Sequence, residues 1–230
     1  MHSKANDMKN SDNKLIIIGT GPFAQIARDY FDRFSDYQVL GFACHREYKD
    51  SDSVYDMPLS AIEDLSEIHS PKEVSVFVAV GYAKMNKMRQ KVYEEIKEKG
   101  YKCPNFIHPN VSICETAELG DNIFIFEDNT IQPYTSIGND TILWSGNHLG
   151  HHSTVGNHCF ISSHVVISGS CKIGNNVFIG VNATFHDSLS IGDESLIGAG
   201  ALITKNTKPK AVYLNSPTKP FPKDSEQLGF

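Results

Sequence analysis

A six-residue repeat in the second half of the chain limits the folds that are open to it. Steps of six from Ile107 to Ile203 meet seventeen consecutive apolar residues, sixteen of them aliphatic, with no insertion. A sandwich of alternating strands would show period two and irregular spacing. Period six predicts a hexapeptide β-helix, in which three repeats form one triangular coil and the aliphatic side chains point inward. We expect the corners to be turned by the glycines that often follow the aliphatic residue, at positions 120, 138, 150, 156, 174, 180, 192 and 198.

The charged residues are distributed unevenly along the chain, whose formal net charge is −6. Residues 104–205 contain nine acidic residues, two lysines and no arginine. A phosphate backbone requires a basic surface, so we expect no nucleic-acid binding by this region. Four lysines follow within residues 206–230, where the repeat ends.

The cysteines and the hydropathy pattern predict the compartment. Five cysteines are scattered without a CxxC pair, which is typical of free thiols rather than of a disulfide framework. Residues 1–14 are polar and lack the apolar stretch of a secretory signal. The aliphatic run Leu15–Ile18 is too short to span a bilayer. We therefore expect a cytoplasmic protein without membrane association.

The first half predicts a Rossmann-like α/β domain. A buried strand at Leu15–Ile18 runs into Gly19-Thr-Gly21-Pro-Phe-Ala24, which is close to the dinucleotide-binding fingerprint. A strand over 74–80 runs into Gly81 and then a charged helix from about Ala83 to Lys99. Backbone amides at such turns suit a diphosphate, although tight strand-to-helix turns alone also require glycines.

The strand over 37–42 ends in Ala43-Cys44-His45, where a dinucleotide-binding fold would carry the acid that binds a ribose. A nicotinamide cofactor is therefore not indicated. We expect four segments: a flexible N-terminal tail over 1–13, the Rossmann-like domain over 14–103, a left-handed parallel β-helix over 104–209, and a C-terminal tail over 210–230.

Taken together, the two halves resemble the bacterial nucleotide-sugar acetyltransferases of the bacillosamine N-acetyltransferase and sialic acid O-acetyltransferase type. The resemblance extends from about Lys14 to Lys210, and it includes the IIIGTG turn, the FVAVG strand, the Phe106-Ile-His-Pro-Asn110 junction and the hexapeptide run. It implies a homotrimer with active sites between subunits. It also implies that the N-terminal domain holds a nucleotide-activated sugar and that acetyl-CoA lies along the β-helix between adjacent subunits.

The resemblance implies a histidine general base in the segment Leu149-Gly-His151-His152-Ser-Thr-Val155-Gly156, at His151. Relatives of the bacillosamine type carry an acid after this base, whereas this chain has His152. Gly169 lies three repeats beyond His151, one coil further, where its N–H would stabilise an oxyanion. We therefore predict that His151, His152 and Gly169 are the catalytic residues.

The resemblance, the few lysines near the β-helix and the positions one turn before His151 together predict binding residues. Relatives often carry Gly-His where this chain has Pro22-Phe23, which leaves the identity of the nucleotide and sugar open. The predicted contacts to acetyl-CoA are Phe160, Gly169, Val181 and Ala199, together with Lys205 and Lys208 for its phosphates. The predicted contacts to the nucleotide-sugar are Gly19, Thr20, Gly21, Pro22, Phe23, Cys44, Gly81, Trp144, Asn147 and His148.

The crowded histidines suggest a metal site, but their spacing argues against one. His152, His158 and His164 are six residues apart, so they should occupy equivalent corners of three different edges and point away from one another. We expect no metal.

The predicted function is N-acetylation of a nucleotide-linked deoxy-amino sugar by acetyl-CoA, in bacterial surface-glycan assembly. The alternatives are a sugar or sialic acid O-acetyltransferase, a γ-type zinc carbonic anhydrase and a non-catalytic sugar-nucleotide binding protein.

Overall fold

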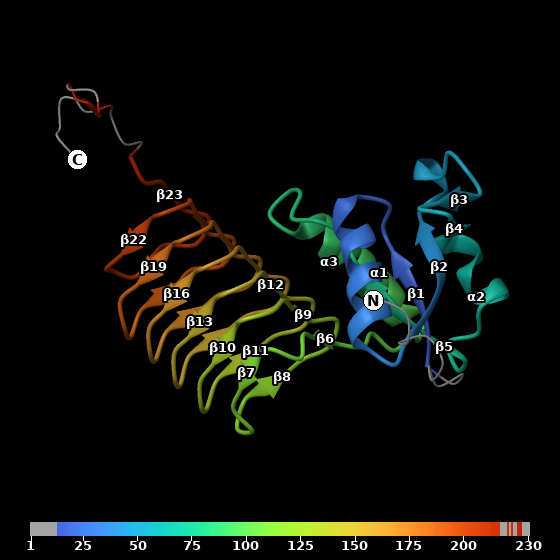
Figure 1. The fold of residues 1–230 in the computed structure, drawn as a ribbon, viewed down its shortest axis with the longest axis horizontal. Coiled ribbons are helices and arrows are strands. Elements are labelled where there is room, and N and C mark those ends of the chain that lie inside the picture. The colour runs from blue at the N-terminus through green and yellow to red at the C-terminus, as the bar shows by residue number, and fades with distance from the viewer. Residues whose placement is uncertain (1–12, 217–219, 221, 223–224, 227–230) are drawn as a thin grey trace.

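The computed structural model describes residues 13–216, 220, 222 and 225–226. It consists of an α/β domain packed against one side of a long triangular β-helix (Figure 1). The flexible tail predicted over 1–13 lies outside the described residues except for Asn13, and the C-terminal tail predicted over 210–230 lies partly outside them. Among the described residues, no helix is both long and apolar enough to cross a bilayer.

The α/β domain has a five-stranded sheet in the order β3-β4-β2-β1-β5. Strand β1 is parallel to both β2 and β5, as the strand–turn–helix pattern predicts, and only β3 pairs antiparallel. Its elements are β1 (Lys14–Ile18), α1 (Pro22–Phe34), β2 (Gln38–Cys44), a 3-10 turn (Arg46–Tyr48), β3 (Ser53–Val54), β4 (Met57–Ala61), a 3-10 turn (Ile62–Asp64), α2 (Leu65–Ile68), β5 (Val74–Val78) and α3 (Lys87–Glu98).

Helix α3 begins later than the predicted Ala83. Lys84, Met85 and Asn86 have left-handed backbone conformations, with φ of 52°, 55° and 63°, and a right-handed helix cannot include them. Asn86 is fully buried at the helix N-cap. Residues 79–86 consequently form a loop between β5 and α3.

The hexapeptide region forms three parallel sheets, which are the faces of the prism. Face I contains β6 (Phe106–Ile107), β9 (Phe124–Ile125), β12 (Ile142–Leu143), β15 (Phe160–Ile161), β18 (Phe178–Ile179), β21 (Leu196–Ile197) and β23 (Val212–Tyr213). Face II contains β7 (Ser112–Ile113), β10 (Thr130–Ile131), β13 (His148–Leu149), β16 (Val166–Ile167), β19 (Thr184–Phe185) and β22 (Leu202–Ile203). Face III contains β8 (Glu118–Leu119), β11 (Ser136–Ile137), β14 (Thr154–Val155), β17 (Lys172–Ile173) and β20 (Ser190–Ile191).

Strands that neighbour each other on a face are one coil apart. Thr130 pairs with His148, and Leu149 pairs with Ile167, so each register step is the three repeats expected from the sequence. The inward aliphatic side chains are almost fully buried, with Ile137 at 2% exposure and Ile179 at 0%. The left-handed parallel β-helix predicted from period six is confirmed.

The corners are built differently from our expectation. The left-handed residue is three positions after the inward aliphatic residue, not one, and it recurs every six residues as Asn, Asp, Tyr, His, Ser, Glu or Gly. The glycines directly after the aliphatic residue are not among the residues with left-handed φ, and they serve close packing instead. A β-carbon on Gly150 would lie 2.5 Å from the carbonyl carbon of Ser168 in the next coil. These glycines therefore allow neighbouring coils to approach.

The five cysteines are free thiols, as predicted. Cys159 and Cys171 are part of the β-helix core and are completely buried. Burial raises the pKa of the Cys159 thiol to about 12, so the thiol remains protonated and behaves as a small apolar side chain.

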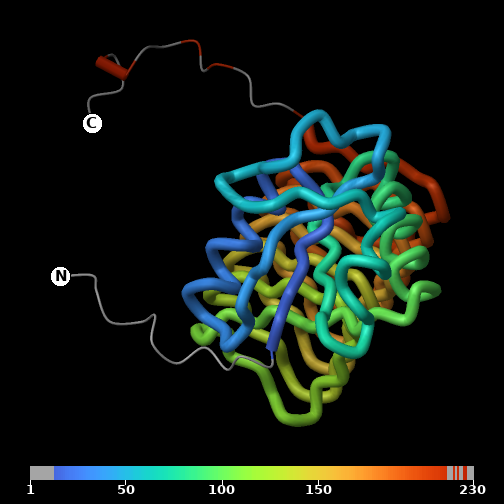
Figure 2. The backbone as a smooth tube through the Cα atoms, turned by 90° about the vertical axis from the view of Figure 1, so that its right-hand side faces the viewer, coloured from blue at the N-terminus to red at the C-terminus, as the bar shows by residue number. Residues whose placement is uncertain are grey.

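The α/β domain covers face I of the β-helix, and Figure 2 shows it lying in front of the stacked coils. The outward side chains of this face include a stack of aromatic rings, in which Phe106 and Phe124 are 4.5 Å apart and Phe160 and Phe178 are 5.6 Å apart between centroids. Helix α1 packs Phe31 against Phe106 at 5.1 Å. Because these rings share one apolar cluster with the core of the α/β domain, the two halves are joined by continuous hydrophobic packing.

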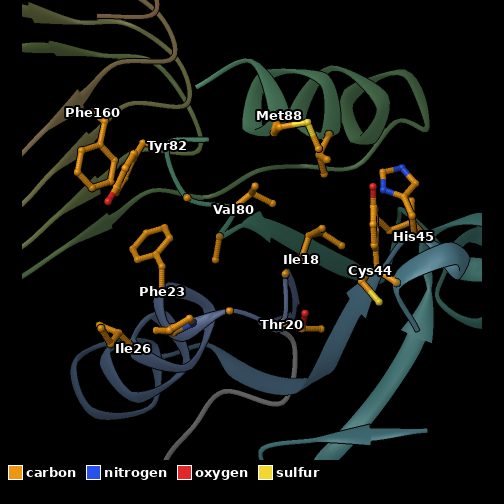
Figure 3. Close-up of a pocket in the computed structure, with 18 of the residues that line it drawn as sticks. Ile18, Thr20, Phe23, Ile26, Cys44, His45, Val80, Tyr82, Met88 and Phe160 are labelled. Carbon is orange, nitrogen blue, oxygen red and sulfur yellow. The ribbon is translucent and has the colours of Figure 1, made fainter. Parts of the chain in front are cut away.

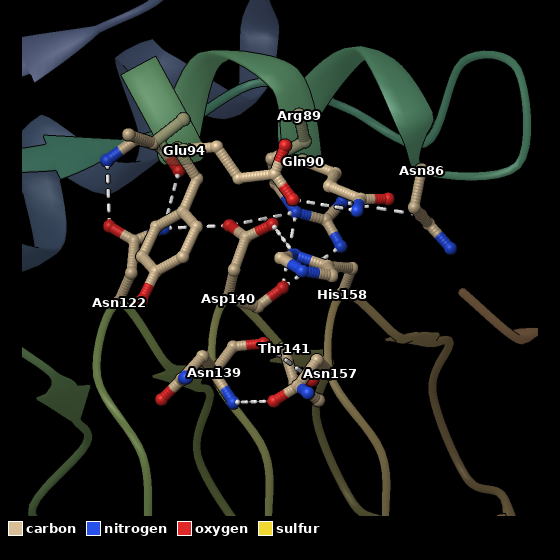
Figure 4. A network of polar contacts seen from close by, with 12 residues as sticks. Asn86, Arg89, Gln90, Glu94, Asn122, Asn139, Asp140, Thr141, Asn157 and His158 are labelled. Carbon is tan, nitrogen blue, oxygen red and sulfur yellow. Dashed lines mark hydrogen bonds and ion pairs between the residues drawn. The ribbon is translucent and has the colours of Figure 1, made fainter. Parts of the chain in front are cut away.

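A buried polar network joins α3 to the edge between faces III and I (Figure 4). Arg89 and Asp140 have fully buried side chains and form an ion pair, with Nε 3.2 Å from Oδ1. Asp140 also accepts a hydrogen bond from Asn122 Nδ2 at 2.8 Å, and its other oxygen lies 2.9 Å from His158 Nδ1. Arg89 Nη2 donates to the carbonyl oxygen of Cys159 at 3.0 Å. The network satisfies both buried charges and holds the start of α3 against the β-helix.

Candidate active site

A cavity of about 580 Å³ lies between the two halves of the chain, at the carboxyl ends of β1, β2 and β5 (Figure 3). Parallel α/β sheets bind ligands at this edge. The lining includes most of the residues predicted to contact the nucleotide-sugar: Gly19, Thr20, Gly21, Pro22, Phe23, Cys44, Gly81 and Trp144. The β-helix also contributes Phe160.

The glycine turn forms one wall of this cavity. Gly19 has φ of 127°, and a β-carbon there would lie 2.8 Å from the carbonyl oxygen of Ala79, so only glycine fits. Helix α1 begins directly after Gly21, which provides no side-chain cap. In the first turn Pro22 has no N–H and the Ala24 amide donates to the Gly21 carbonyl at 2.9 Å. The Phe23 amide is therefore the one in this turn that an anionic group can use, at the positive end of the helix dipole.

The two ends of the cavity differ in chemistry. One end is aromatic, because Phe23, Tyr82, Phe160 and Trp144 meet there. Trp144 Nε1 is buried and, within the described part of the chain, has no hydrogen-bond partner. The other end includes the imidazole of His45, which follows β2, and Figure 3 shows it far from Phe160.

Asn147 and His148 lie away from this cavity. Asn147 is 4% exposed inside the β-helix, where its Oδ1 accepts from the Val165 amide at 2.8 Å and its Nδ2 donates to the Trp144 carbonyl. Its polar atoms therefore stabilise the coils. His148 lies half-buried on the outer side of face II.

His151 lies on the edge between faces II and III, after β13. It is exposed, its backbone amide donates to Gln132 Oε1 at 2.9 Å, and its Nδ1 is 3.1 Å from Nδ1 of His152. The predicted stacking on Gly169 is confirmed, since a β-carbon at Gly169 would lie 2.8 Å from Nε2 of His151. Within the described residues, the Gly169 amide donates no hydrogen bond.

The cavity and His151 are on opposite sides of the β-helix. Each coil runs from face I to face II to face III, so the edge between faces II and III is opposite face I. The α/β domain with its cavity covers face I, whereas His151 is on the opposite edge. A ligand in the cavity of one chain therefore cannot meet the His151 of the same chain.

The residues predicted to contact acetyl-CoA are not on one edge. Val181 and Ala199 are exposed, one coil apart, on the edge between faces I and II. Phe160 is 6% exposed beneath Tyr82 on face I, with ring centroids 4.8 Å apart. Lys205 and Lys208 are exposed in the final coil.

The corner histidines are arranged as predicted. His152, His158 and His164 have the same φ of 58° and lie on three different edges of the prism. In the described ranges, no three His, Cys, Asp or Glu side chains gather as a metal-binding group.

Two family models match the chain. Residues 14–96 match the PglD N-terminal domain, and residues 134–169 and 170–205 each match the bacterial transferase hexapeptide model of six repeats. These matches confirm the resemblance to the nucleotide-sugar acetyltransferases in both halves of the chain. A comparison with curated proteins finds no match.

Solved structures of similar fold span both halves. A histidine-to-asparagine variant of perosamine N-acetyltransferase from Caulobacter crescentus, in complex with CoA and GDP-perosamine, is 22% identical with a TM-score of 0.80, over 90% of this chain and 96% of that one. The acetyltransferase domain of PglB from Neisseria gonorrhoeae, in complex with acetyl coenzyme A, is 23% identical with a TM-score of 0.62, over 91% of this chain and 100% of that one. The two-domain architecture is thus shared with both.

Proposed function

We propose that this chain, which joins a PglD N-terminal domain to bacterial transferase hexapeptide repeats, is an acetyltransferase that transfers the acetyl group of acetyl-CoA to the amino group of a nucleotide-linked sugar. The observation that carries the proposal is the cavity at the Gly19–Phe23 turn, which combines the uncapped start of α1 with an aromatic end on the β-helix. The GDP-perosamine and CoA held by the similar Caulobacter enzyme support the same pair of substrates.

The proposed chemistry is direct transfer. The sugar amine attacks the thioester carbonyl, His151 accepts the proton that the amine loses, and the tetrahedral oxyanion is stabilised by the Gly169 amide. The C–S bond then breaks, and CoA leaves as the thiol after it takes up a proton. The contact between the His151 ring and Gly169 supports these roles, because it places the base and the free amide side by side.

His152 takes the place of the acid that follows the base in relatives. Its Nδ1 is 3.1 Å from Nδ1 of His151, and two ring nitrogens in contact need one donor and one acceptor. If His151 donates its Nδ1–H, its Nε2 retains the lone pair that a base needs. We propose that the lone pair of His152 Nδ1 holds His151 in this tautomer, as carboxylates do in other catalytic pairs.

We propose a homotrimer as the active form. The cavity and His151 are separated by the full width of the β-helix, so the acceptor held by one chain requires the His151 edge of another chain. Cyclic symmetry supplies such a neighbour to every chain. In this arrangement acetyl-CoA lies between adjacent β-helices, near Val181 and Ala199, and Lys205 and Lys208 face its phosphates.

The proposed setting is surface-glycan synthesis in the bacterial cytoplasm, where nucleotide-sugars are made. A thiol-detecting dye measures CoA release from acetyl-CoA with a panel of nucleotide-linked amino and hydroxy sugars. We expect turnover with an amino sugar and a loss of at least about 100-fold in kcat for His151→Asn. The control is His69→Gln, a histidine of the α/β domain away from the cavity. Activity of His151→Asn near the wild-type level would refute the base assignment, and zinc-dependent hydration of CO₂ would refute the whole proposal.

A further inference from the structure

The carboxyl end of β2 carries an arrangement that its sequence does not reveal. Dinucleotide-binding folds place a carboxylate there, which accepts a hydrogen bond from a ribose 2′-hydroxyl. This chain has His45 at that place, and it lines the cavity. Glu95 of α3, fifty residues further along the chain, supplies a carboxylate behind the imidazole: its Oε2 is 2.8 Å from His45 Nε2.

The contact determines which nitrogen of His45 remains available as a hydrogen-bond acceptor. An ionised carboxylate only accepts hydrogen bonds, so the imidazole must donate Nε2–H to Glu95. The other Glu95 oxygen lies 3.8 Å from Lys99 Nζ, so the carboxylate has a partner on each side. In the neutral ring Nδ1 then carries the lone pair, and no residue of the described chain shares a hydrogen bond with it. Both side chains are about three-quarters buried, with 24% and 29% exposure, so the pair is held in place.

The position of His45 in the cavity indicates which part of a bound nucleotide-sugar it would contact. Given the proposed function, the amino sugar must leave the α/β domain and extend towards the space between neighbouring β-helices. The end of the cavity at Trp144 and Phe160 is the end that lies on the β-helix, so we place the sugar there. The diphosphate then lies at the Gly19–Phe23 turn. The nucleoside is left with the opposite end, where His45 is located (Figure 3).

We propose that His45, oriented by Glu95, accepts a hydrogen bond from the ribose 2′-hydroxyl, so that the site selects ribonucleoside diphosphate sugars over 2′-deoxyribonucleoside diphosphate sugars. This inference rests on the proposed function and deepens it. An imidazole backed by a carboxylate provides the same acceptor as a bare acid, yet it places the negative charge one ring further from the diphosphate. The His45–Glu95 pair can therefore accept the hydrogen bond of the hydroxyl with less electrostatic repulsion of the phosphates than a carboxylate at the position of His45 would cause.

The test compares matched ligands that differ in one oxygen atom. Dissociation constants are measured by titration calorimetry on the full chain for UDP and 2′-deoxy-UDP, and for GDP and 2′-deoxy-GDP. Loss of one well-aligned hydrogen bond should weaken binding about 5- to 20-fold, so we expect that ratio between each deoxy nucleotide and its ribose form.

Variants separate His45 from other causes of this preference. His45→Phe keeps a ring of similar size without an acceptor, and we expect the ratio to fall to about 1. His45→Asn places a carbonyl oxygen near the position of Nδ1, so it should retain most of the preference. Glu95→Gln should lower the ratio because the tautomer is no longer enforced. Glu94→Gln is the matched control on the same helix, since Glu94 is exposed and bonds to Gln90. Thermal melts verify that each variant is folded.

The possible results distinguish failure of this inference from failure of the proposed function. Equal binding of the ribose and deoxy forms by the wild type, or an unchanged ratio in His45→Phe, overturns this inference and leaves the proposed function standing. Failure of all four nucleotides to bind overturns the proposed nucleotide site, and the inference with it. A ratio that falls in His45→Phe and survives in His45→Asn and Glu94→Gln supports the inference.

Discussion

The imidazole of His151 lies directly against the α-carbon of Gly169, one coil further along the β-helix. A β-carbon at Gly169 would be 2.6 Å from Cε1 and 2.8 Å from Nε2 of the ring. The smallest possible enlargement, Gly169→Ala, should therefore displace His151 while leaving the coil paired. We expect kcat to fall about 100-fold or more, comparable to loss of an oxyanion donor, with the melting temperature nearly unchanged.

Gly169→Ala is measured by steady-state kinetics and circular dichroism. The control is Asp187→Ala, the exposed residue one coil beyond Gly169 on the same edge. Wild-type kcat in Gly169→Ala would show that the position of the His151 ring is not important for the reaction.

The separation of the cavity from His151 predicts complementation between two inactive variants. His151→Asn removes the proposed base, and Gly81→Trp fills the cavity from a position where a β-carbon meets nothing within 4 Å. In trimers assembled from equal amounts of both, about one quarter of the sites would combine an intact cavity with an intact His151. Co-expression with two different affinity tags, followed by tandem purification, should recover activity. Mixed trimers without activity would show that each chain acts alone.

Asp140 is the centre of the buried network under α3 and should be critical for stability. Asp140→Ala leaves the Arg89 guanidinium buried without its partner, which costs about 3–5 kcal/mol in comparable buried pairs. The free energy of unfolding, measured in urea, should decrease by that amount. Lys97→Met is the matched control on α3: Lys97 pairs with Asp121 at the surface, and its loss should cost at most about 1 kcal/mol. Equal losses in the two variants would contradict the importance of the network.

The lysines at the end of the repeat should affect acetyl-CoA binding. Lys205→Glu combined with Lys208→Glu reverses two charges in a region with few cations, so we expect the KM for acetyl-CoA to rise about 3- to 10-fold at low salt, with kcat little changed. The KM for the nucleotide-sugar should be unaffected. Lys91→Glu on the exposed side of α3 is the control. A KM for acetyl-CoA that does not change would exclude contact with its phosphates.

Glu127 links α1 to the edge between faces I and II and should contribute to acid sensitivity. Burial acts to raise the pKa of Glu127, but hydrogen bonds from Ser145 Oγ at 2.6 Å and Tyr30 OH at 3.0 Å outweigh it, so the pKa lies below its usual value. The resulting stabilisation is complete above the unfolded-state pKa of about 4.3 and is lost as the pH falls through the lower folded-state value.

Urea unfolding at pH 7 and pH 3 checks this dependence. The wild type should lose more stability between the two values than Glu127→Gln, which has no charge to titrate. Asp128→Asn, the exposed neighbour, should behave like the wild type. Identical losses in wild type and Glu127→Gln would contradict the prediction.

Much of the site was predictable because the β-helix is periodic. A repeat of six with no insertion determines which residues stack, so the contact between His151 and Gly169 followed from counting three repeats along the chain. The separation of His152, His158 and His164 onto three edges followed in the same way. The role of the glycines that follow the inward aliphatic residues was not predictable. A period of six does not show whether a glycine is needed for a left-handed backbone at a corner or for close contact between neighbouring coils.

The role of Asn147 could not be predicted from the sequence. It is near Trp144 in the chain, and we predicted both as substrate contacts. Trp144 follows face I and lines the cavity, whereas Asn147 turns inward and bonds to the coils on either side. Three residues are half a repeat, so their side chains point in different directions.

The sequence by itself determined the triangular coil, the strand–turn–helix at Gly19 and the stacking along each edge, because these depend on local turns and on contacts between successive repeats. Only the tertiary structure decided which face the α/β domain covers, and with it the cavity, the pairing of His45 with Glu95 and that of Arg89 with Asp140. These contacts join residues about fifty positions apart. They depend on the packing of helix α3 against the end of β2 on one side and against the β-helix on the other. No local sequence pattern predicts that packing.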